Sequence, residues 1–275
     1  MSVRNYQGKL FRGNSSEFRL DALTVEEALQ IDVNGDPFTL TMRTPGDDQA
    51  LVRGILHSES ILKSSNYKPE IVLKKESKDG ILTQVNVSIP QDQLGSGITN
   101  KRNLLSVASC GICGKTSLDE RGFLDACLPV EQKICISHLE SAFEQMEKVQ
   151  KAFRQSGGSH AAAAFSFSGE MLCYAEDIGR HNAVDKVIGK LILENQFKNA
   201  ALLTVSGRIS YEIVIKCFKG RIPVLAAISA PSSLAVDYAK ELGITLFAFC
   251  RDDRATCYAH PERVNQNRNF NNQVS

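Results

Sequence analysis

Two cysteines in the segment Ser109-Cys110-Gly111-Ile112-Cys113-Gly114 carry the clearest chemical potential in this chain. Two thiols separated by two residues can form a disulfide, ligate a metal ion, or carry a sulfur atom as a persulfide. The glycines of the segment add no side-chain bulk and permit positive φ, which predicts an exposed and mobile loop. Which of the three chemistries applies decides what the protein does.

The metal-binding interpretation lacks ligands. A zinc site usually has four, and Cys110 and Cys113 supply only two. No second Cys-x-x-Cys occurs, and Cys250 and Cys257 have the wrong spacing. His57-Ser58-Glu59 ahead of the cysteine pair imitates the pattern of zinc deaminases, but a serine replaces the proline expected before the first cysteine. The sequence therefore predicts no metal ligands, and a zinc enzyme is kept only as a third interpretation.

The position of the two thiols separates a redox pair from a sulfur carrier. A thioredoxin-like pair lies between a strand and a helix near the start of its fold, whereas this pair lies in a long irregular stretch. A sulfur carrier needs an accessible thiol that can accept sulfane sulfur and release it. Cys113, three residues after Cys110, could attack a persulfide there and expel sulfide by thiol exchange. The glycine-rich setting favours this interpretation.

The bulk composition is that of a soluble globular protein. Of the 275 residues, 43% are hydrophobic and 23% charged, and the formal net charge is +1, so neither nucleic acid nor an acidic membrane is expected as a partner. No apolar run reaches the ~18 residues of a membrane span, and the first residues lack the pattern of a secretory signal. We therefore expect a cytoplasmic protein, in which the eight cysteines do not imply disulfides.

The N-terminal part predicts a small strand-rich α+β domain over residues 1–125. A hairpin over 26–43 is expected to turn at Asn34-Gly35, a strong signal for a two-residue connection. A helix and a second hairpin follow, the hairpin over 71–89. Periodicity then disappears between about 90 and 115, where a Gly/Ser/Asn-rich loop carries the cysteine pair and ends the domain.

The C-terminal part predicts an α/β domain over residues 126–263. A helix over 139–153 comes first, followed by two strands and a helix within 161–193. Apolar strands then alternate with helices between 200 and 249, which is typical of a largely parallel sheet covered on both faces. Residues 264–275 are rich in Asn and Gln, and we expect a disordered tail there.

Polar residues follow each predicted strand of this domain. Ligands of open parallel sheets bind outside the carboxyl ends of the strands, where helix N-termini and hydroxyls suit phosphate oxygens and arginines add bidentate donors. An acidic residue after the last strand could pair with the amidine edge of guanine. Helix capping with solvated arginines is the alternative, and for His160 and His181 a structural role stays open. Repetition at four strand ends favours a phosphate-rich nucleotide, with the candidate residues Arg180, His181, Ser206, Gly207, Arg208, Ser229, Ser232, Arg251, Asp252, Asp253 and Arg254.

Taken together, these segments resemble the FdhD family of formate dehydrogenase accessory sulfurtransferases. The resemblance covers about residues 25–263 in family order. It implies a sulfur carrier that takes sulfur from a cysteine desulfurase as a persulfide and passes it to the bis-molybdopterin guanine dinucleotide form of the molybdenum cofactor, which then enters formate dehydrogenase. The segments that carry it are residues 44–48, 109–114, 176–186, 206–212, 229–236 and 249–254.

The resemblance also assigns roles to individual residues. Cys110 matches the persulfide-bearing cysteine and Cys113 its partner. A cytidine-deaminase-like main domain without zinc chemistry and a homodimer are implied as well. A chaperone that binds the cofactor without transferring sulfur is the alternative. The matched cofactor-binding segment, in which Cys250 departs from the family pattern, comprises Phe249, Cys250, Arg251, Asp252, Asp253 and Arg254.

Overall fold

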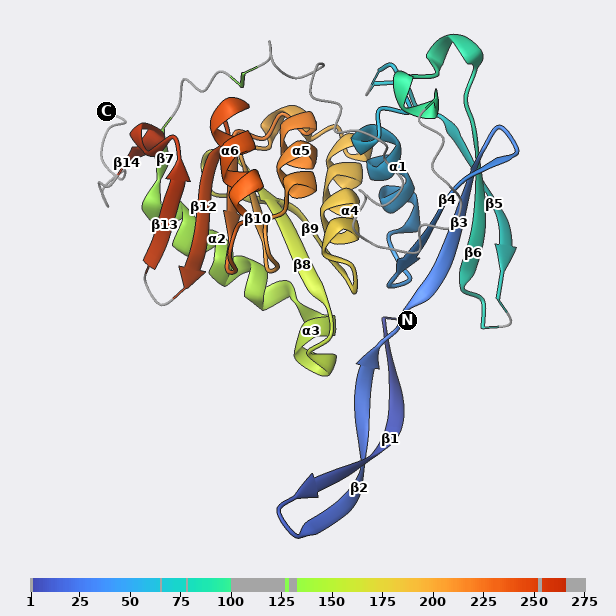
Figure 1. Ribbon diagram of the computed structural model, residues 1–275. Helices are drawn as coiled ribbons and strands as arrows, with labels where there is room; N and C mark the ends of the chain where they lie inside the picture. Colours follow the sequence, from blue (N-terminus) through green and yellow to red (C-terminus); the bar gives the residue numbers. More distant parts are fainter. Residues whose placement is uncertain are drawn as a thin grey trace.

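A computed structural model describes residues 2–64, 66–77, 79–99, 127–128, 133–251 and 254–265 (Figure 1). It contains a six-stranded sheet with helices on both faces, a four-stranded sheet beside it, and a long two-stranded hairpin that projects from the body. Helices α1 and α4 lie between the two larger sheets. None of the described helices is long and apolar enough to cross a membrane.

The six-stranded sheet is mixed, which corrects the prediction of a largely parallel one. Only β10–β11 and β11–β12 pair in parallel, and the three other pairings are antiparallel. The reason is connection length, because the short turn at Ser168-Gly169 and the two residues after Arg251 can join only antiparallel strands. The strands run in the order β13 (Arg254–Ala259), β12 (Thr245–Arg251), β11 (Val224–Ala227), β10 (Leu202–Val205), β8 (His160–Phe165) and β9 (Met171–Asp177).

Two hydrophobic clusters cover the faces of this sheet, because successive strand residues point to opposite sides. Helices α4 (Arg180–Leu193), α5 (Tyr211–Lys219) and α6 (Ser233–Glu241) pack on one face, against residues such as Leu203, Leu225 and Leu246. Helix α2 (Ile136–Val149) packs on the other, against Phe165, Leu202 and Phe247. The predicted helix over 139–153 is divided at Gln150, and α3 (Lys151–Ser156) ends at Gly157, whose φ is 65°.

The four-stranded sheet confirms the two predicted hairpins. Its order is β4 (Asp36–Arg43), β3 (Glu27–Val33), β6 (Leu82–Ser88) and β5 (Glu70–Glu76), and α1 (Asp48–Ser58) covers it through a separate cluster that includes Leu29, Leu51 and Val85. Asn34 and Gly35 both have positive φ, as the tight turn between β3 and β4 requires. The remaining elements are 3₁₀ turns and a small parallel pair: Gln91–Gln93, Ser96–Thr99, Phe197–Asn199, Pro261–Arg263, β7 (Ile134–Cys135) and β14 (Val264–Asn265).

Helices α1 and α4 touch through their backbones. A Cβ atom on Gly54 would lie 1.9 Å from the carbonyl oxygen of Asp185, and one on Gly189 would lie 1.8 Å from that of Ala50. Any larger residue at either glycine would therefore force the helices apart. The two glycines set the distance between the four-stranded sheet and the larger domain.

A buried polar network also connects the segment before α1 to α4. The Lys186 ammonium lies 2.7 Å from the Asp177 carboxylate and 2.8 Å from the carbonyl oxygen of Thr44, whose own N–H donates to Asp177. Burial raises the pKa of Asp177, while Lys186 and the donors on Gly179 and Asn182 act in the opposite direction. The segments at 44–48 and 176–186, which carried much of the resemblance, thus join two parts of the fold.

A second buried ion pair involves Asp185, the residue directly before Lys186 on α4. Asp185 accepts from Lys216 of α5 at 2.7 and 2.8 Å and from the hydroxyl of Ser58 at the end of α1. His57 packs edge-on against Phe197, and its Nε2 lies 2.9 Å from the carbonyl oxygen of Lys219. Three helices are therefore held together at this point.

The projecting hairpin was not predicted. Strands β1 (Val3–Arg12) and β2 (Ser15–Thr24) pair over their full length, and the ribbon extends away from both sheets (Figure 1). The proposed domain boundary at 125/126 and residues 266–275 of the proposed tail lie outside the described residues, and the division 1–125, 126–263 and 264–275 stays a prediction.

Candidate anion-binding site at one edge of the sheet

The predicted strand ends converge along one edge of the six-stranded sheet, the edge at which β10, β11 and β12 all end. Strand β8 runs against β10, and β9 runs against β8, so the start of β8 and the end of β9 lie at the same edge as the ends of β10 to β12. His160 pairs with Asp177 in this register, and the N–H of Ser206 donates to the carbonyl oxygen of Ala161. His160 therefore lies beside the candidate residues after β10.

Gly207 forms a close cradle between two basic side chains. A Cβ atom there would lie 3.2 Å from Nδ1 of His160 and 3.3 Å from Cβ of Arg180, so only glycine leaves this approach open. Nε of Arg180 is buried and has no hydrogen-bond partner among the described residues. A buried guanidinium nitrogen without an acceptor is costly, and an anionic ligand would supply the acceptor.

Electrostatics at the cradle favour an anion as well. Burial lowers the pKa of His160, and Arg180, His181 and Arg208 lower it further, while Asp177 opposes them. The side chain of Arg208 is exposed, and it adds a positive charge to this edge. Two arginines, Arg180 and Arg208, thus act on His160 at a site whose buried carboxylate, Asp177, is already paired with Lys186.

His181 belongs to a buried polar group beneath this edge. Its Nε2 lies 3.1 Å from the hydroxyl of Ser210 and 3.4 Å from the carboxylate of Glu212, and Ser210 donates to Glu212 at 2.8 Å. Burial works to raise the pKa of Glu212, but the hydrogen bonds from His181 and Ser210 outweigh it, and the net shift is downward. Ser210 and Glu212 were not among the predicted site residues; a hydroxyl and a carboxylate two residues apart at a helix start was the available signal.

Phe249 has a strained backbone at the end of β12. Its φ is 54°, a left-handed conformation that is costly for an aromatic residue, and the register with β13 shifts between Ala248 and Arg251. Its N–H donates to the carbonyl oxygen of Ser229 at 3.3 Å, which ties the bulge to the end of β11. Such bulges re-aim strand ends beside functional sites. Phe249 is the only described residue of the predicted 249–254 segment with this strain.

The other residues of the 249–254 segment are placed differently. Arg251 and Arg254 are exposed and pair across β12 and β13. Cys250 points into the cluster under α2, where burial raises its pKa to about 12. Asp252 and Asp253, expected to bind guanine, lie outside the described residues.

The three predicted serines have separate hydrogen-bond partners. Ser206 accepts from the N–H of Ala161, and Ser232 caps α6 by accepting from the N–H of Ala235, which matches the alternative of ordinary capping. The carbonyl oxygen of Ser229 accepts from the N–H of Phe249. Of the three, Ser229 has the position closest to the strained bulge.

Cys110 and Cys113 lie outside the described residues, and their assignment stays a prediction from the sequence. Six other cysteines are described, and all are free thiols. Burial raises the pKa of Cys173 to about 12, and that of Cys217 still further. In the part of the chain that the structure describes, no three His, Cys, Asp or Glu side chains gather closely enough to hold a metal ion.

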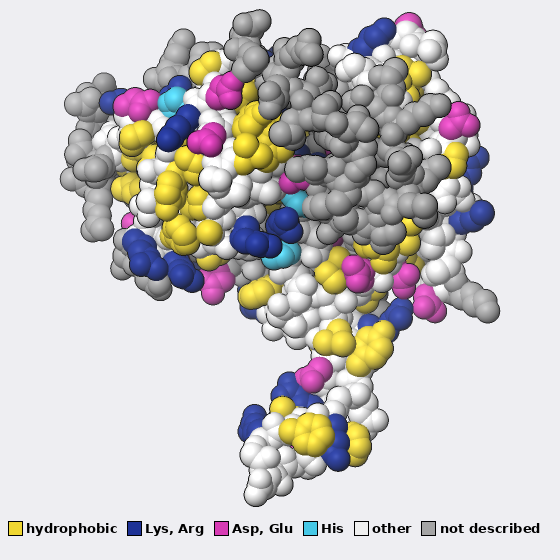
Figure 2. All heavy atoms as spheres, in the orientation of Figure 1, with side chains coloured by type: hydrophobic (Ala, Val, Ile, Leu, Met, Phe, Trp, Pro, Cys, Tyr) yellow, Lys and Arg dark blue, Asp and Glu magenta, His cyan; other side chains and the backbone are white. Residues whose placement is uncertain are grey.

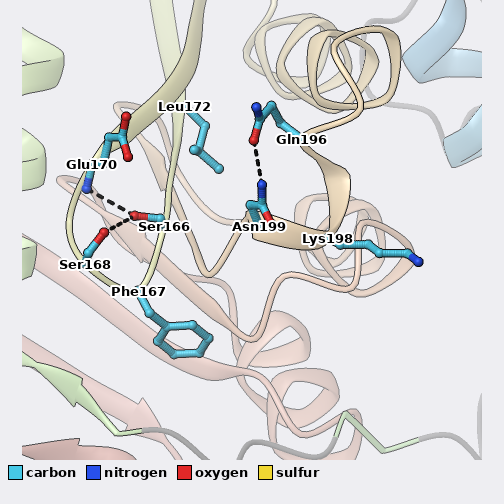
Figure 3. Close-up of a pocket in the computed structure, with 8 residues that line it drawn as sticks. All are labelled: Ser166, Phe167, Ser168, Glu170, Leu172, Gln196, Lys198 and Asn199. Atoms are coloured by element: carbon cyan, nitrogen blue, oxygen red, sulfur yellow. Dashed lines mark hydrogen bonds between the residues drawn. The ribbon is translucent and has the colours of Figure 1, made fainter.

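A shallow depression of about 580 Å³ lies at the opposite edge of the sheet (Figure 3). It is formed where β8 ends, β9 begins and the chain enters β10, and its polar groups bond to one another: Ser166 with Ser168 and Gln196 with Asn199. None of the predicted site residues lines it, so it is separate from the cradle at Gly207.

The fold and the site define a mixed α/β protein with a basic cradle at one sheet edge. Residues 24–265 match the model of the FdhD/NarQ family, and the chain belongs to that family. It is 41% identical to the sulfur carrier protein FdhD of Streptomyces avermitilis, over 92% of each chain. It is 38% identical to that of Saccharolobus solfataricus, over 96% of this chain and all of the relative.

A solved structure shares the fold. The crystal structure of a "putative formate dehydrogenase accessory protein" from Desulfotalea psychrophila superimposes with a TM-score of 0.75, covering 96% of this chain and 100% of its own. At 22% identity, this likeness concerns the fold alone.

Proposed function

We propose that the protein is a sulfur carrier that receives sulfur from a cysteine desulfurase on Cys110 and delivers it to the bis-molybdopterin guanine dinucleotide molybdenum cofactor for formate dehydrogenase. Membership of the FdhD/NarQ family and the curated sulfur carrier relatives support this assignment. The observation in the structure that carries it is the cradle of His160, Arg180 and Gly207, with the buried Nε of Arg180 lacking an acceptor among the described residues.

The cofactor is the acceptor of the sulfur and not a resident group of the protein. Its pyrophosphate would accept from Arg180 and Arg208, and its guanine would pair with Asp252 or Asp253. Gly207 leaves room for the phosphate to approach the backbone. Arg251 and Arg254, both exposed at the last strand end, would neutralise the second dinucleotide of the bis form.

The sulfur steps balance by thiol exchange. The Cys110 thiolate attacks the terminal sulfur of the desulfurase persulfide, forming a persulfide on Cys110 and releasing the desulfurase thiolate. Attack of Cys113 on Sγ of Cys110 then breaks the persulfide bond and expels hydrosulfide to the acceptor. The resulting Cys110–Cys113 disulfide must be reduced by a dithiol reductant before the next cycle.

Mass spectrometry tests the proposal directly. Incubation with a cysteine desulfurase and cysteine should add one sulfur to the protein, and dithiothreitol should remove it. Cys110→Ala should abolish the gain, while Cys257→Ala, at a partly exposed free thiol outside the pair, should retain it. A gain that survives Cys110→Ala, or no gain in the native chain, would reject the proposal.

The competing function is a cofactor chaperone in which the cysteine pair only docks. It predicts that Cys110→Ala and Cys113→Ala still yield active formate dehydrogenase. Metal analysis of the purified protein tests the zinc interpretation. A cytosolic location, a cytidine-deaminase-like layering of the main domain and a homodimer complete the proposal.

A further inference from the structure

Two buried polar atoms at the basic edge of the sheet have no hydrogen-bond partner among the described residues. One is Nε of Arg180, and the other is Oε1 of Glu212. A phosphate would supply an acceptor for Arg180, but it cannot serve a carboxylate oxygen, which needs a donor. An anion alone therefore meets only half of what this edge requires.

The carboxylate of Glu212 is held in place through its other oxygen. Oε2 accepts from the hydroxyl of Ser210 at 2.8 Å and lies 3.4 Å from Nε2 of His181. Ser210 occupies the N-cap position of α5, where a serine usually accepts from a backbone N–H, yet its hydroxyl makes no such bond. This hydroxyl orients Glu212 instead of capping the helix, and Oε1 is left for a further donor.

The charge of Glu212 makes the missing donor costly. Burial works to raise the pKa of its carboxyl, but the hydrogen bonds from His181 and Ser210 lower it by more. The side chain is only 11% exposed, so water does not compensate Oε1. The dipole of α5 favours an acidic residue in the first turn, but it forms no hydrogen bond with that oxygen.

The two unpartnered atoms belong to elements in contact. Arg180 and His181 begin α4, and His181 reaches Glu212 at the start of α5. A Cβ atom on Gly207 would lie 3.4 Å from Cδ of Arg180, the carbon that carries Nε, so the loop between β10 and α5 passes beside the guanidinium. Figure 2 shows Lys or Arg side chains beside histidines near the lower ends of α4 and α5. One ligand can therefore offer an acceptor to Arg180 and a donor to Glu212.

The chemistry of these two atoms indicates a ring with amino donors on an anionic ligand. The 2-amino-4-oxopyrimidine ring, which guanine and pterin share, carries a ring N–H next to its amino group. Each dinucleotide of the cofactor in the proposed function contains both a guanine and a pterin, so a carboxylate besides Asp252 and Asp253 has a ring to bind. We propose that Oε1 of Glu212 accepts from the 2-amino group of one such ring and makes the site specific for that group. This inference rests on the proposed function and adds a specificity-determining residue to it.

Paired probes that differ at the 2-amino group test this assignment by calorimetry. Guanosine diphosphate is compared with inosine diphosphate, which lacks the group, and 6,7-dimethylpterin with 6,7-dimethyllumazine, which has an oxygen in its place. The native chain should bind the amino form of at least one pair about tenfold more tightly or better, because a site built to bond a donor rejects the analogue without it.

Glu212→Gln should reduce the preference in one pair to less than about threefold. The amide oxygen of the variant can still accept from Ser210, which turns its NH₂ group toward the ligand and sets donor against donor. The pair that loses its preference identifies the ring as guanine or pterin. Affinity for the form without the amino group should change less than about threefold, whereas a merely structural glutamate would weaken both forms alike. Glu170→Gln, at the exposed depression on the opposite edge, is the matched control and should keep the native preference.

Two results would overturn the proposal. If every preference survives Glu212→Gln, this residue does not read the ring, and cofactor binding itself still stands; Asp252→Asn and Asp253→Asn then show whether those residues do. If the native chain prefers the amino form in neither pair, the site does not recognise the group at all. Sulfur loading on Cys110 is measured by mass without any of these probes, so the sulfur-carrier function and this inference fail separately.

Discussion

The ammonium of Lys186 lies 2.7 Å from the carboxylate of Asp177, and both side chains are almost completely removed from water. Lys186 also bonds to the backbone of Thr44, so one side chain connects α4 to the segment that leads into α1. Removing one partner of a buried pair leaves the other charge uncompensated, which costs more than the intact pair contributes.

We therefore expect Lys186→Met to lower the free energy of unfolding by about 3–5 kcal/mol, measured by chemical denaturation. Lys190→Met is the matched control on the same helix, because the Lys190–Asp47 pair is partly exposed, and its cost should stay below about 1 kcal/mol. Equal costs for the two variants would contradict a special role for the buried pair.

Arg180→Met should separate binding from stability. Because Nε of Arg180 is buried without a partner among the described residues, its removal should leave the free energy of unfolding unchanged or raise it. The affinity for guanosine diphosphate, a probe for half of the proposed cofactor, should fall at least about tenfold, which is about 1.4 kcal/mol by calorimetry. Arg12→Met, at the far end of the hairpin, should leave that affinity intact. Loss of stability without loss of affinity would indicate a structural arginine.

His160 should make ligand binding pH-dependent. Burial lowers the pKa of His160, and the charge of Arg180 lowers it further. A bound anion would favour the charged imidazole, so anion binding should be accompanied by uptake of a proton. Affinity for guanosine diphosphate should rise as the pH falls below about 6.5, and His160→Gln should flatten the rise, whereas His138→Gln should not.

The stability of the ligand-free protein should change with pH in the opposite sense to its affinity, falling as the pH falls. A histidine whose folded pKa lies below its unfolded value contributes stability that is present above about pH 6.5 and lost as the pH falls through the folded pKa. Thermal melts of the native chain and of His160→Gln across this range give the sign directly.

Gly54→Ala and Gly189→Ala should each destabilise the protein by about 3 kcal/mol or more, although alanine favours helices. Each new Cβ would meet a backbone carbonyl at under 2 Å, where no side chain can move away. Gly8→Ala in β1 is the control, since its nearest neighbour is 3.6 Å away, and it should cost less than about 1 kcal/mol. Unfolding in denaturant measures all three, and a stabilised Gly54→Ala would refute the backbone contact.

Cys250 should take no part in sulfur loading. Its thiol packs in the core with a pKa raised by burial to about 12, so its thiolate is scarce at neutral pH. Cys250→Ala should keep the full desulfurase-dependent mass gain and lower the unfolding free energy by about 1 kcal/mol. A mass gain that disappears in Cys250→Ala would return this residue to the chemistry.

Much of the fold follows from periodicity. The alternation of apolar strands and helices after Ala200, and the Asn34-Gly35 turn, predicted elements that the structure contains. Strand β13 and the antiparallel pairings were missed, because the direction of a strand depends on connection length more than on its own residues. The β1–β2 hairpin was missed because β1 carries apolar and polar residues on both of its faces, although Phe18, Leu20 and Ala22 alternate with charged residues on β2.

The site was predicted in part. The basic strand ends do meet at one edge, and the cradle includes His160, which the sequence left open. The buried charges Asp177, Asp185, Lys186 and Lys216 could not be foreseen, since a charged residue on a helix usually faces water and only tertiary packing reveals its partner. The cysteine pair and the acidic residues after β12 stay predictions.

The contact between the Lys186 ammonium and the backbone of Thr44 bears on how members of this family are recognised. A change at Lys186 or Asp177 would leave the other charge buried and unpaired, so the fold itself requires both segments. A descendant that had abandoned sulfur delivery would keep both segments and still be assigned to the family. When the family is assigned from sequence, these segments therefore indicate common ancestry. Whether a member still transfers sulfur must be judged from Cys110 and Cys113.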